Sequence, residues 1–402
     1  DRGSSAVHII WRFCFGCQFN CHRHTFEYLQ NYPNHMKILI TGTHLTPALA
    51  VIEELKKNYH SEIVYVGRNT TLEGDETPSV ESQILPKLGV KFVSIIAGRL
   101  QRTLTIYTIP SLLKIPIGFL QALFIILAEK PDVILSFGGY VAVPSVFVGW
   151  LFSIPIIIHD QTLVSGLANK ISSFFADKIA ISFNQTKNYL KSNHKIVFTG
   201  NPIRQELRVV KDRQEALSFF GFDDNKFTIL VMGGSQGSHR INTCFLKAVS
   251  MITDKSRFQI IHLAGPKDLG LLDSGYRDLQ AAFKLFSFLK EMQYAYSIAD
   301  FAITRAGATT IAELAFFGIP AIIIPYPFAY KHQFNNAQAL SKHATAILIK
   351  DNELDPEKLR EVLVDLMNNP NKIKLMRSHY NRISKTNAND LLIDEVLSLM
   401  TA

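Results

Sequence analysis

Three short segments in the second half of the chain combine glycines, hydroxyl groups and a carboxylate in a way that suits a phosphate-bearing ligand. Segment 233–238 (GGSQGS) follows an apolar run, so its glycines let backbone amides approach a phosphate, and the Ser235 hydroxyl adds a donor. The turn 305–308 (RAGA) leads into a predicted helix, 309–317, whose first N–H groups form a second anion-binding position. Glu313, one turn into that helix, can bind a ribose diol, although an ordinary surface helix also carries such residues.

The glycine loop does not match two common nucleotide-binding motifs. The glycine loop is neither a G-x-G-x-x-G fingerprint nor a P-loop, which would end in Lys-Ser or Lys-Thr. No acidic residue follows it at the distance expected for a nicotinamide ribose contact. The chain also lacks an Asp-x-Asp pair for a divalent cation, so we expect neither a metal nor a cofactor.

Length and composition predict a two-domain globular protein with an acidic partner. The 402 residues are too many for one ordinary α/β domain, and a chain with 47% hydrophobic and 19% charged residues can bury a core. The net charge of +8 favours nucleic acid, anionic lipid or a phosphorylated substrate, although it can also serve solubility alone. No dense run of lysine and arginine is present, so nucleic acid is not expected as a partner.

The cysteines indicate a reducing environment. Three of the four crowd the start of the chain, at positions 14, 17 and 21, and only Cys244 lies beyond them. This distribution is typical of a cytoplasmic protein without a disulfide framework. Because His22 and His24 are close by, the same spacing permits a metal knuckle, which we regard as the weaker hypothesis.

The fold is expected to begin at Met36. Segment 1–35 shows no clear periodicity and no sustained apolar stretch of the kind found in signal peptides. Met36, in contrast, is followed directly by a strand-like run. We therefore interpret residues 1–35 as a non-native or disordered extension upstream of the fold.

Beyond that start, β-branched runs alternate with amphipathic segments, which predicts two doubly wound parallel α/β sheets. The turn 200–204 and the polar sequence after it separate the two series. We predict a first domain over 36–202 and a second over 203–375. Segment 376–402 ends in a predicted helix, 387–400, that is apolar at three- to four-residue spacing and must pack on another part of the protein.

Two uncharged or basic stretches of the first domain raise the question of membrane contact. In residues 87–129 no acidic side chain lies between the ends, and Arg99, Arg102 and Lys114 are surrounded by apolar residues. This composition suits a surface that lies on anionic lipid, and it suits a core helix with solvated cations equally well.

Residues 132–160 have no charge between their ends and are long enough to suggest a membrane span. Gly138, Gly139 and Pro144 interrupt this stretch. We therefore predict a strand, a glycine loop, a buried helix and a second strand instead of a span.

Six motifs, taken in order, resemble the MurG family of peptidoglycan glycosyltransferases. They are FGGY (137–140), HDQ (159–161), GNPIR (200–204), GGSQGS (233–238), RAGATTIAE (305–313) and HQFNNA (332–337). The resemblance covers nearly the whole chain from Met36 onward. It implies a GT-B fold, with two Rossmann-like domains facing a cleft. It also implies transfer of N-acetylglucosamine from UDP-N-acetylglucosamine to lipid I, which forms lipid II in peptidoglycan biosynthesis.

The resemblance further implies partners and a location. The second domain would bind UDP-N-acetylglucosamine. The first would bind undecaprenyl-linked lipid I and would face the anionic inner membrane surface, through Arg99, Arg102 and Lys114, as a peripheral protein on the cytoplasmic side. Other cell-wall synthesis proteins would be further partners, and the product would serve cell shape and cell division. The last helix would return to the first domain.

Carried over position by position, the resemblance assigns a donor site. The glycine loop would contact the diphosphate, Glu313 the ribose hydroxyls and the backbone at Leu289 the uracil, while Arg204 would position the nucleotide. Gln333 and Asn336 would bind the sugar, and the first loop of the first domain would close over it. The full donor set is Thr41, Gly42, Thr43, Thr162, Arg204, Gly234, Ser235, Gln236, Gly237, Leu289, Ala308, Thr309, Thr310, Glu313, Gln333 and Asn336.

For the first domain, the resemblance implies an acceptor side of the cleft at Gly138, Gly139 and Tyr140. An inverting transfer needs a base that takes the proton of the attacking hydroxyl. His44 is the best-placed titratable group, because its unperturbed pKa is near neutrality. Its alternative role is that of a helix cap or a phosphate contact. A helix N-terminus with a glycine loop can stabilise the UDP leaving group without a metal.

Two positions depart from the family's pattern. The family's first loop reads roughly Gly-Gly-Thr-Gly-Gly-His, whereas residues 40–44 here read ITGTH, which is a bulkier loop. The family has Asn after His-Glu-Gln, whereas Thr162 here follows His-Asp-Gln and offers only a hydroxyl. We therefore expect an altered approach of the acceptor and a weaker or rearranged sugar contact.

Two alternative functions stay open from the sequence. One is a GT-B enzyme that uses another lipid acceptor, such as a diacylglycerol or another polyprenyl-linked sugar. The other is a non-catalytic nucleotide-sugar-binding scaffold, which the altered first loop motivates.

Overall fold

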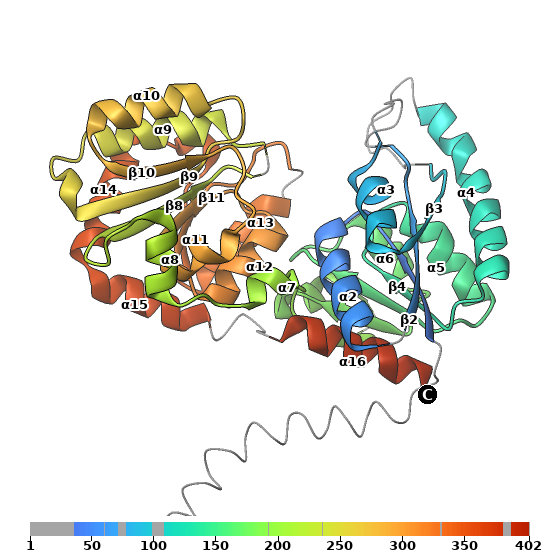
Figure 1. The fold of residues 1–402 in the computed structure, drawn as a ribbon. Coiled ribbons are helices and arrows are strands. Elements are labelled where there is room, and N and C mark those ends of the chain that lie inside the picture. Colours follow the sequence, from blue (N-terminus) through green and yellow to red (C-terminus); the bar gives the residue numbers. More distant parts are fainter. Residues whose placement is uncertain are drawn as a thin grey trace, which may run out of the picture.

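The computed structural model contains two α/β lobes, each built on its own parallel sheet (Figure 1). It describes residues 36–59, 61–70, 78–98, 108–191, 193–234, 236–329, 332–380 and 387–401. The expectations for residues 1–35, with the alternative metal knuckle, and for Arg99, Arg102 and Ser235 lie outside the described residues and stay predictions.

The first lobe has the strand order β3-β2-β1-β4-β5-β6-β7, and its paired strands run parallel. Its strands are β1 (Met36–Thr41), β2 (Ser61–Gly67), β3 (Lys91–Ser94), β4 (Val133–Ser136), β5 (Ile156–Asp160), β6 (Lys178–Ile181) and β7 (Ile196–Phe198). The central strands are apolar at nearly every position because helices cover both faces, and Ile38, Leu39 and Ile40 are fully buried. The loops after β1, β4 and β5 start from the same edge of the sheet, since parallel strands end together.

Two helix layers cover this sheet. Helices α2 (Leu45–Asn58) and α16 (Ala388–Met400) pack on one face. Helices α4 (Thr108–Glu129) and α5 (Ala142–Leu151) pack on the other, with α6 (Leu167–Ser172) beside α5, while the short α3 (Val80–Ile84) leads toward β3. The strand, glycine loop, buried helix and strand predicted over 132–160 are confirmed as β4, α5 and β5. None of the helices in the described ranges combines the length and the apolar character needed to cross a membrane.

The second lobe has the strand order β10-β9-β8-β11-β12-β13, again with parallel pairings. Its strands are β8 (Phe227–Met232), β9 (Phe258–Leu263), β10 (Ala282–Phe286), β11 (Phe301–Thr304), β12 (Ala321–Ile323) and β13 (Ala346–Leu348). One face packs on α9 (His239–Ser250), α10 (Leu269–Leu279), α14 (Pro356–Asn368) and α15 (Pro370–His379). The other face packs on α7 (Gln205–Arg208), α8 (Arg213–Phe220), α11 (Met292–Ile298), α12 (Ala308–Phe317) and α13 (His332–Lys342).

The structure corrects two sequence-based boundaries in this lobe. The sequence predicts a polar, aromatic loop that ends at His332 and Gln333, but these residues begin α13. Helix α13 has few apolar side chains among many polar ones, so no apolar stripe marks it in the sequence. The sequence also predicts a strand over 285–288, whereas β10 covers Ala282–Phe286 and Leu289 follows it in a loop.

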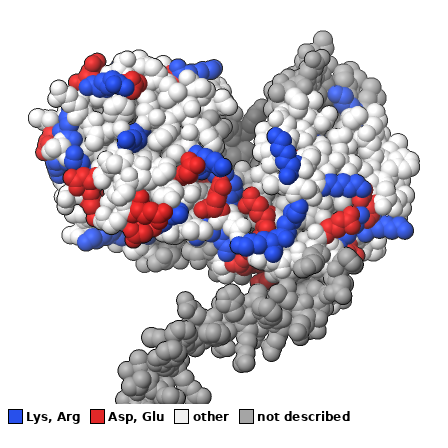
Figure 2. Space-filling model, in the orientation of Figure 1, with Lys and Arg blue, Asp and Glu red and all other residues white. Residues whose placement is uncertain are grey.

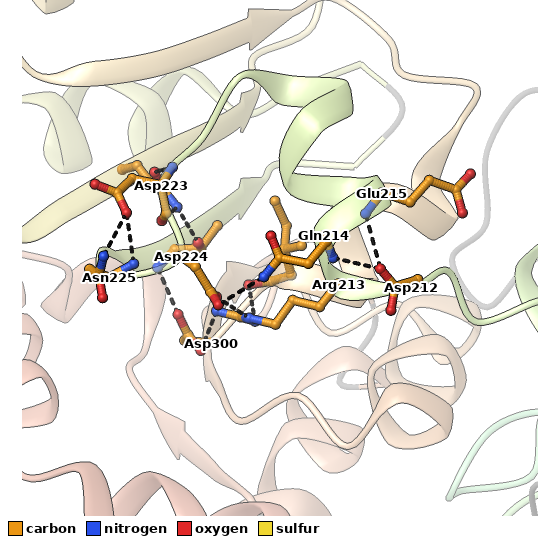
Figure 3. Close-up of polar contacts among 11 residues, drawn as sticks. Asp212, Arg213, Gln214, Glu215, Asp223, Asp224, Asn225 and Asp300 are labelled. Atoms are coloured by element: carbon orange, nitrogen blue, oxygen red, sulfur yellow. Dashed lines mark hydrogen bonds and ion pairs between the residues drawn. The ribbon is translucent and has the colours of Figure 1, made fainter.

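A polar cluster at the start of the second lobe fastens α8 to the sheet (Figure 3). Asp212 caps α8 by accepting hydrogen bonds from two backbone N–H groups of its first turn, at 2.9 and 3.2 Å. Arg213 pairs with Asp224 at 2.6 Å and lies 4.0 Å from Asp300, at the start of β11. Each of these carboxylates has a partner within the protein, so the cluster serves the fold.

Helix α16 returns from the second lobe to the first and fastens the linker between them (Figure 1). Asn389 is buried there, and its Oδ1 accepts a hydrogen bond from Ile203 N at 3.0 Å. Its Nδ2 donates to Ile203 O at 3.0 Å and to Ala50 O of α2 at 3.3 Å. Arg208 of α7 adds an ion pair with Glu54 of α2 at 2.8 Å.

Replacing Asn389 by alanine should lower the free energy of unfolding by about 1–3 kcal/mol, because it leaves buried backbone groups of the linker without hydrogen-bond partners. Urea unfolding measures this loss. Asn387→Ala is the matched control, since Asn387 is exposed and makes no capping hydrogen bond to the described residues of α16. Equal stabilities of the two variants would contradict the anchoring role of Asn389.

Candidate functional site

A cleft of about 980 Å³ lies between the two lobes. Its first-lobe wall has an apolar part, formed by Ile115, Phe119, Val143, Pro144, Leu167 and Ile171. The polar part of the same wall is formed by His44, Gly139, Tyr140, Asp160, Gln161, Thr162 and Asn169. The second lobe contributes Ala306, Gly307, Ala308, Thr309, Ala329, His332, Gln333 and Asn336. Polar groups from loops that follow strands of both sheets therefore meet across one space.

On the first-lobe side, the loop after β1 packs directly on the glycine loop after β4. Thr43 N donates to Gly138 O at 3.0 Å. Gly138 and Gly139 have φ angles of 73° and 86°, and a Cβ on Gly139 would lie 2.2 Å from Thr43 Oγ1. A Cβ on Gly42 would lie 2.8 Å from the backbone of Phe137. The bulkier first loop of this chain therefore fits through close contact between two backbones, and it leaves Tyr140 in the cleft wall.

Two hydroxyl groups that the resemblance assigns to the binding of the sugar donor already have hydrogen-bond partners within the protein. Thr41 is fully buried, and its hydroxyl donates to Val66 O of β2 at 3.0 Å. The Thr162 hydroxyl lies 3.1 Å from Asp160 Oδ1 and 3.0 Å from Val164 O. The side chain of Thr41 thus faces the sheet, and the hydroxyl of Thr162 is engaged within its own loop.

His44 stands immediately before α2, in the cleft wall. Its imidazole is open to the cleft but surrounded by protein, and this desolvation lowers its pKa. The Asp160 carboxylate acts in the opposite direction, and His332 across the cleft lowers the pKa further. Because the pKa lies below the usual value, the imidazole is neutral at pH 7 and can accept a proton. Its side chain makes no capping hydrogen bond to the described residues of α2, which removes support for the capping alternative.

The HDQ motif places two titratable residues at the end of β5. His159 is fully buried, and its Nε2 lies 2.9 Å from Gly200 O, so it ties β5 to the linker. Burial lowers the pKa of His159 to about 4, and the ring is therefore neutral. Asp160 Oδ1 accepts hydrogen bonds from the backbone N–H and the hydroxyl of Thr162, at 3.2 and 3.1 Å.

On the second-lobe side, the described part of the glycine loop leads into the N-terminus of α9. Gly234 and Gly237 have φ angles of 97° and 74°, and a Cβ on Gly237 would lie 1.8 Å from Ala264 O. Gln236 is exposed, and Ser238 caps α9 by accepting from a backbone N–H at 3.5 Å. The loop therefore brings backbone amides to a helix start, which is the arrangement that binds a phosphate.

A second helix start, that of α12, opens directly into the cleft. Gly307 precedes this helix and has no side chain to cap it, so the N–H groups of 308–310 lack a side-chain cap in the described structure. Arg305 joins the two helix starts, because it donates to Ser238 Oγ at 2.8 Å and pairs with Asp351 at 2.5 Å. The two N-termini are thus held together by one guanidinium group.

Glu313 lies one turn into α12 and is buried. Its Oε2 accepts a hydrogen bond from Tyr296 OH of α11 at 2.7 Å. Burial raises the pKa of Glu313, while the Tyr296 hydrogen bond and the charge of Arg204 lower it. Arg204 pairs with Glu206 at 2.6 Å, and its buried Nε has no hydrogen-bond partner among the described residues. A carboxylate and an unused guanidinium N–H are therefore close enough to influence each other.

Gln333 and Asn336 on α13 shape the turn before α12. Gln333 Oε1 accepts from Ala306 N at 3.2 Å and from Tyr326 N at 2.9 Å, so any sugar contact of Gln333 falls to its Nε2. Asn336 Oδ1 accepts from Leu163 N of the first lobe at 3.2 Å, and its Nδ2 donates to Ala306 O at 3.3 Å. Asn336 therefore joins the two lobes and retains one N–H for a ligand.

The structure adds functional candidates that the sequence analysis missed. No local sequence pattern marks Tyr296 as a site residue, because its contact with Glu313 depends on how α11 packs on α12. Asp160 belongs to a motif noted in the sequence but had no role there. Leu289 is buried in the second-lobe core, so only its backbone remains for the predicted uracil contact.

Comparison with known proteins adds independent information. The Glycosyltransferase family 28 N-terminal domain matches residues 39–181, and the Glycosyltransferase family 28 C-terminal domain matches residues 228–393. A Halothermothrix orenii protein named UDP-N-acetylglucosamine--N-acetylmuramyl-(pentapeptide) pyrophosphoryl-undecaprenol N-acetylglucosamine transferase is 38% identical over 367 residues, which are 88% of this chain and 95% of that protein. A Desulforamulus reducens protein of the same name is 34% identical over 363 residues, 87% of this chain and 93% of its own. The crystal structure of Acinetobacter baumannii MurG covers 90% of this chain and 99% of its own, with a TM-score of 0.72 at 24% identity.

Proposed function

Because the chain belongs to the MurG family of N-acetylglucosamine transferases, we propose that it transfers N-acetylglucosamine from UDP-N-acetylglucosamine to the muramyl sugar of lipid I, with inversion at the anomeric carbon. It is a hexosyltransferase of the GT-B type, with two family 28 domains. Its product, lipid II, would serve cell wall biogenesis and through it cell shape and division. The observation that supports this most directly is the cleft, whose walls contain the N-terminus of α12 on one lobe and the His44 imidazole on the other.

The reaction divides between the two lobes. The oxygen of the acceptor hydroxyl attacks C1 of the sugar, the bond from C1 to the UDP oxygen breaks, and His44 takes the hydroxyl proton. The amides at the starts of α9 and α12 stabilise the negative charge that develops on UDP. Glu313 accepts hydrogen bonds from the ribose hydroxyls, and the charge of Arg204 favours the ionised form of its carboxylate. These residues need no metal ion for their roles.

The first-lobe wall suits a lipid-linked acceptor. Beside the polar groups of the cleft lie six apolar side chains from α4, α5 and α6. An isoprenoid chain attached to the diphosphate of the acceptor would find apolar surface there, next to the reaction centre. A diacylglycerol acceptor would use the same wall, so this wall supports a lipid acceptor without selecting its sugar.

We place the first lobe against an anionic membrane surface. Helix α4 exposes four large apolar side chains at three- to four-residue spacing, and α5 ends in three more. They are Ile117, Leu120, Phe124, Leu127, Trp150, Leu151 and Phe152. Figure 2 shows the side of the first lobe with α4 largely free of charged side chains. Lys114 lies in the N-terminal part of the same helix, and an acceptor carried on undecaprenol would itself reside in the membrane.

Replacing Leu120 and Phe124 together by serine should weaken binding to vesicles that contain anionic phosphatidylglycerol by about 10-fold or more, because two large side chains lose their burial in lipid. Sedimentation with vesicles at low salt measures the effect. Leu375→Ser is the control, since this exposed leucine lies on α15 of the other lobe. Failure of the unaltered protein to sediment with anionic vesicles would contradict the membrane placement.

The decisive experiment for the function uses the protein from Met36 onward, UDP-N-acetylglucosamine and a soluble lipid I analogue. We expect release of UDP together with a product that contains one added N-acetylglucosamine. Release that depends on diacylglycerol instead would support the other-acceptor alternative. Release no greater than that of a Glu313→Ala variant would support the non-catalytic scaffold.

A further inference from the structure

A buried amide side chain of α9 fixes the backbone just after β9. Asn242 is fully buried, and its Nδ2 donates to Ala264 O at 2.9 Å and to Asp268 Oδ2 at 2.7 Å. Burial raises the pKa of Asp268, but hydrogen bonds from His239 and Asn242 outweigh this effect and lower the pKa, so the carboxylate is ionised. Both partners of Nδ2 can therefore only accept, and the amide of Asn242 has one possible orientation.

The other end of this amide meets a buried histidine. His262 Nε2 lies 3.0 Å from Asn242 Oδ1, and burial lowers the pKa of His262 to about 3, so the ring is neutral at pH 7. Because Oδ1 only accepts, Nε2 carries the proton, and Nδ1 accepts from the Tyr276 hydroxyl at 2.6 Å. Removing that hydroxyl would leave the Nε2–H in place, since Asn242 still accepts from it. Each donor in this chain thus has one acceptor, which allows a single arrangement.

The Ala264 carbonyl that Asn242 fixes packs against the glycine loop. A Cβ on Gly237 would lie 1.8 Å from Ala264 O, and a Cβ on Gly265 would lie 2.3 Å from Gln236 O. The two backbones therefore touch, with no room for a side chain between them. Any shift of the Ala264 carbonyl would move the loop, and the loop leads directly into the N-terminus of α9.

We propose that Asn242 is a positioning residue for the sugar donor: it fixes the Ala264 carbonyl, which holds the glycine loop in the arrangement that binds the diphosphate of UDP. His262 acts behind it, because its N–H keeps the amide from turning. Both side chains are fully buried, so they act through the loop and not on the ligand. The benefit is preorganisation, since amides already in place bind a phosphate without an ordering cost. The proposal rests on the placement of the UDP diphosphate at α9 in the proposed function.

Asn242→Ala tests the proposal, because it removes the hydrogen bond to the Ala264 carbonyl. We expect the affinity for UDP to fall about 10-fold, which corresponds to the loss of one hydrogen bond to a charged phosphate. The affinity for uridine, which has no phosphate, should stay within about twofold. Titration calorimetry measures UDP binding, and NMR titration measures uridine binding. An equal loss for both ligands, or no loss for UDP, would overturn the proposal.

Gln259→Ala is the matched control, since Gln259 is a fully buried amide at the other end of β9. It donates to Asp223 O at 2.8 Å and to Thr228 Oγ1 at 2.9 Å, and neither residue belongs to the glycine loop. The control should lower stability and leave the affinity for UDP within about twofold. A control affinity as low as that of Asn242→Ala would make the effect a general loss of stability and would overturn the proposal.

Two variants of His262 test the inner part of the chain, and they also serve if Asn242→Ala does not fold. His262→Phe keeps a ring but has no N–H for Asn242 Oδ1, so it should weaken UDP binding several-fold. His262→Gln has an amide N–H that can take the place of Nε2–H, so it should keep most of the affinity. Equal affinities of these two variants for UDP would overturn the role of His262.

UDP binding does not require sugar transfer, so the inference and the proposed function can fail separately. A protein that binds UDP and loses this affinity in Asn242→Ala, yet transfers no sugar to the lipid I analogue, would contradict the proposed function and support the inference. Transfer by the unaltered protein, together with an unchanged UDP affinity in Asn242→Ala, would overturn the inference and leave the proposed function supported.

Discussion

Replacing His44 by alanine is expected to lower kcat about 100-fold or more while the dissociation constant of UDP stays within about twofold. The imidazole stands in the first-lobe wall of the cleft, whereas the groups proposed to bind UDP lie on the second lobe. Loss of the imidazole removes the acceptor of the hydroxyl proton and leaves the helix N-termini in place. Single-turnover rates together with UDP titration calorimetry separate the two quantities.

The pH dependence of the same reaction follows from the lowered pKa of His44. Desolvation holds this pKa below the usual value, and only the neutral imidazole can take a proton. The rate should therefore stay constant through pH 7 and fall only as the pH drops through a value below about 6.5. In His44→Ala this acid limb should be absent.

The matched control for this variant is His194→Ala, because His194 is exposed and is not part of the cleft wall. It should leave both the rate and the affinity for UDP unchanged. A rate for His44→Ala that equals that of the control would remove His44 from the mechanism. A large loss of UDP affinity instead would make His44 a phosphate contact, which is its alternative role.

The sheets could be predicted from the sequence because their strands have a clear local pattern of apolar residues. Runs such as 133–136 and 156–159 are apolar at successive positions, and a strand buried on both faces requires this pattern. Glycines at 138 and 139 are equally informative, since their positive φ angles and close contacts exclude a side chain. The amino-acid sequence alone therefore predicts these strands and the glycine loop that follows β4.

The hydrogen-bond partners of individual side chains could not be predicted from the sequence in the same way. Thr162 reads as a residue free to contact a sugar, but its hydroxyl turns back to Asp160, because a turn of three residues brings the two together. Asn336 reads as a ligand contact, yet it also bonds Leu163 of the other lobe, 173 positions away in the sequence. Such contacts depend on how lobes and loops pack, which no local pattern encodes. The α13 helix was missed for a related reason, since its burial comes from that packing.

Replacing Glu313 by glutamine is expected to weaken UDP binding by about 10- to 100-fold. Hydrogen bonds to a charged acceptor contribute about 1.5–3 kcal/mol, and about 1.4 kcal/mol corresponds to a tenfold change in affinity. The change preserves the shape of the side chain, so the loss reports the charge and its hydrogen bonds. Titration calorimetry with UDP measures it, and an affinity within twofold of the unaltered protein would contradict a ribose contact by Glu313.

Tyr296→Phe provides a finer test of the same site through pH. Burial raises the pKa of Glu313, and the Tyr296 hydroxyl, which donates to Oε2 at 2.7 Å, counteracts this by stabilising the ionised form. Without the hydroxyl the pKa rises further, so the carboxylate becomes protonated, and UDP binding weakens, at a higher pH than in the unaltered protein. The affinities of the two proteins should therefore be closest near pH 8 and should diverge as the pH is lowered toward 5.5.

Tyr276→Phe is the matched control for this shift. Tyr276 is also buried in the second lobe and bonds His262 Nδ1 at 2.6 Å, so its loss costs a comparable hydrogen bond without touching Glu313. The control should lose stability and keep the pH dependence of UDP binding. If Tyr296→Phe and Tyr276→Phe gave the same pH dependence, Glu313 would not be the group whose ionisation governs UDP binding, and the ribose contact would have to lie elsewhere in the second lobe.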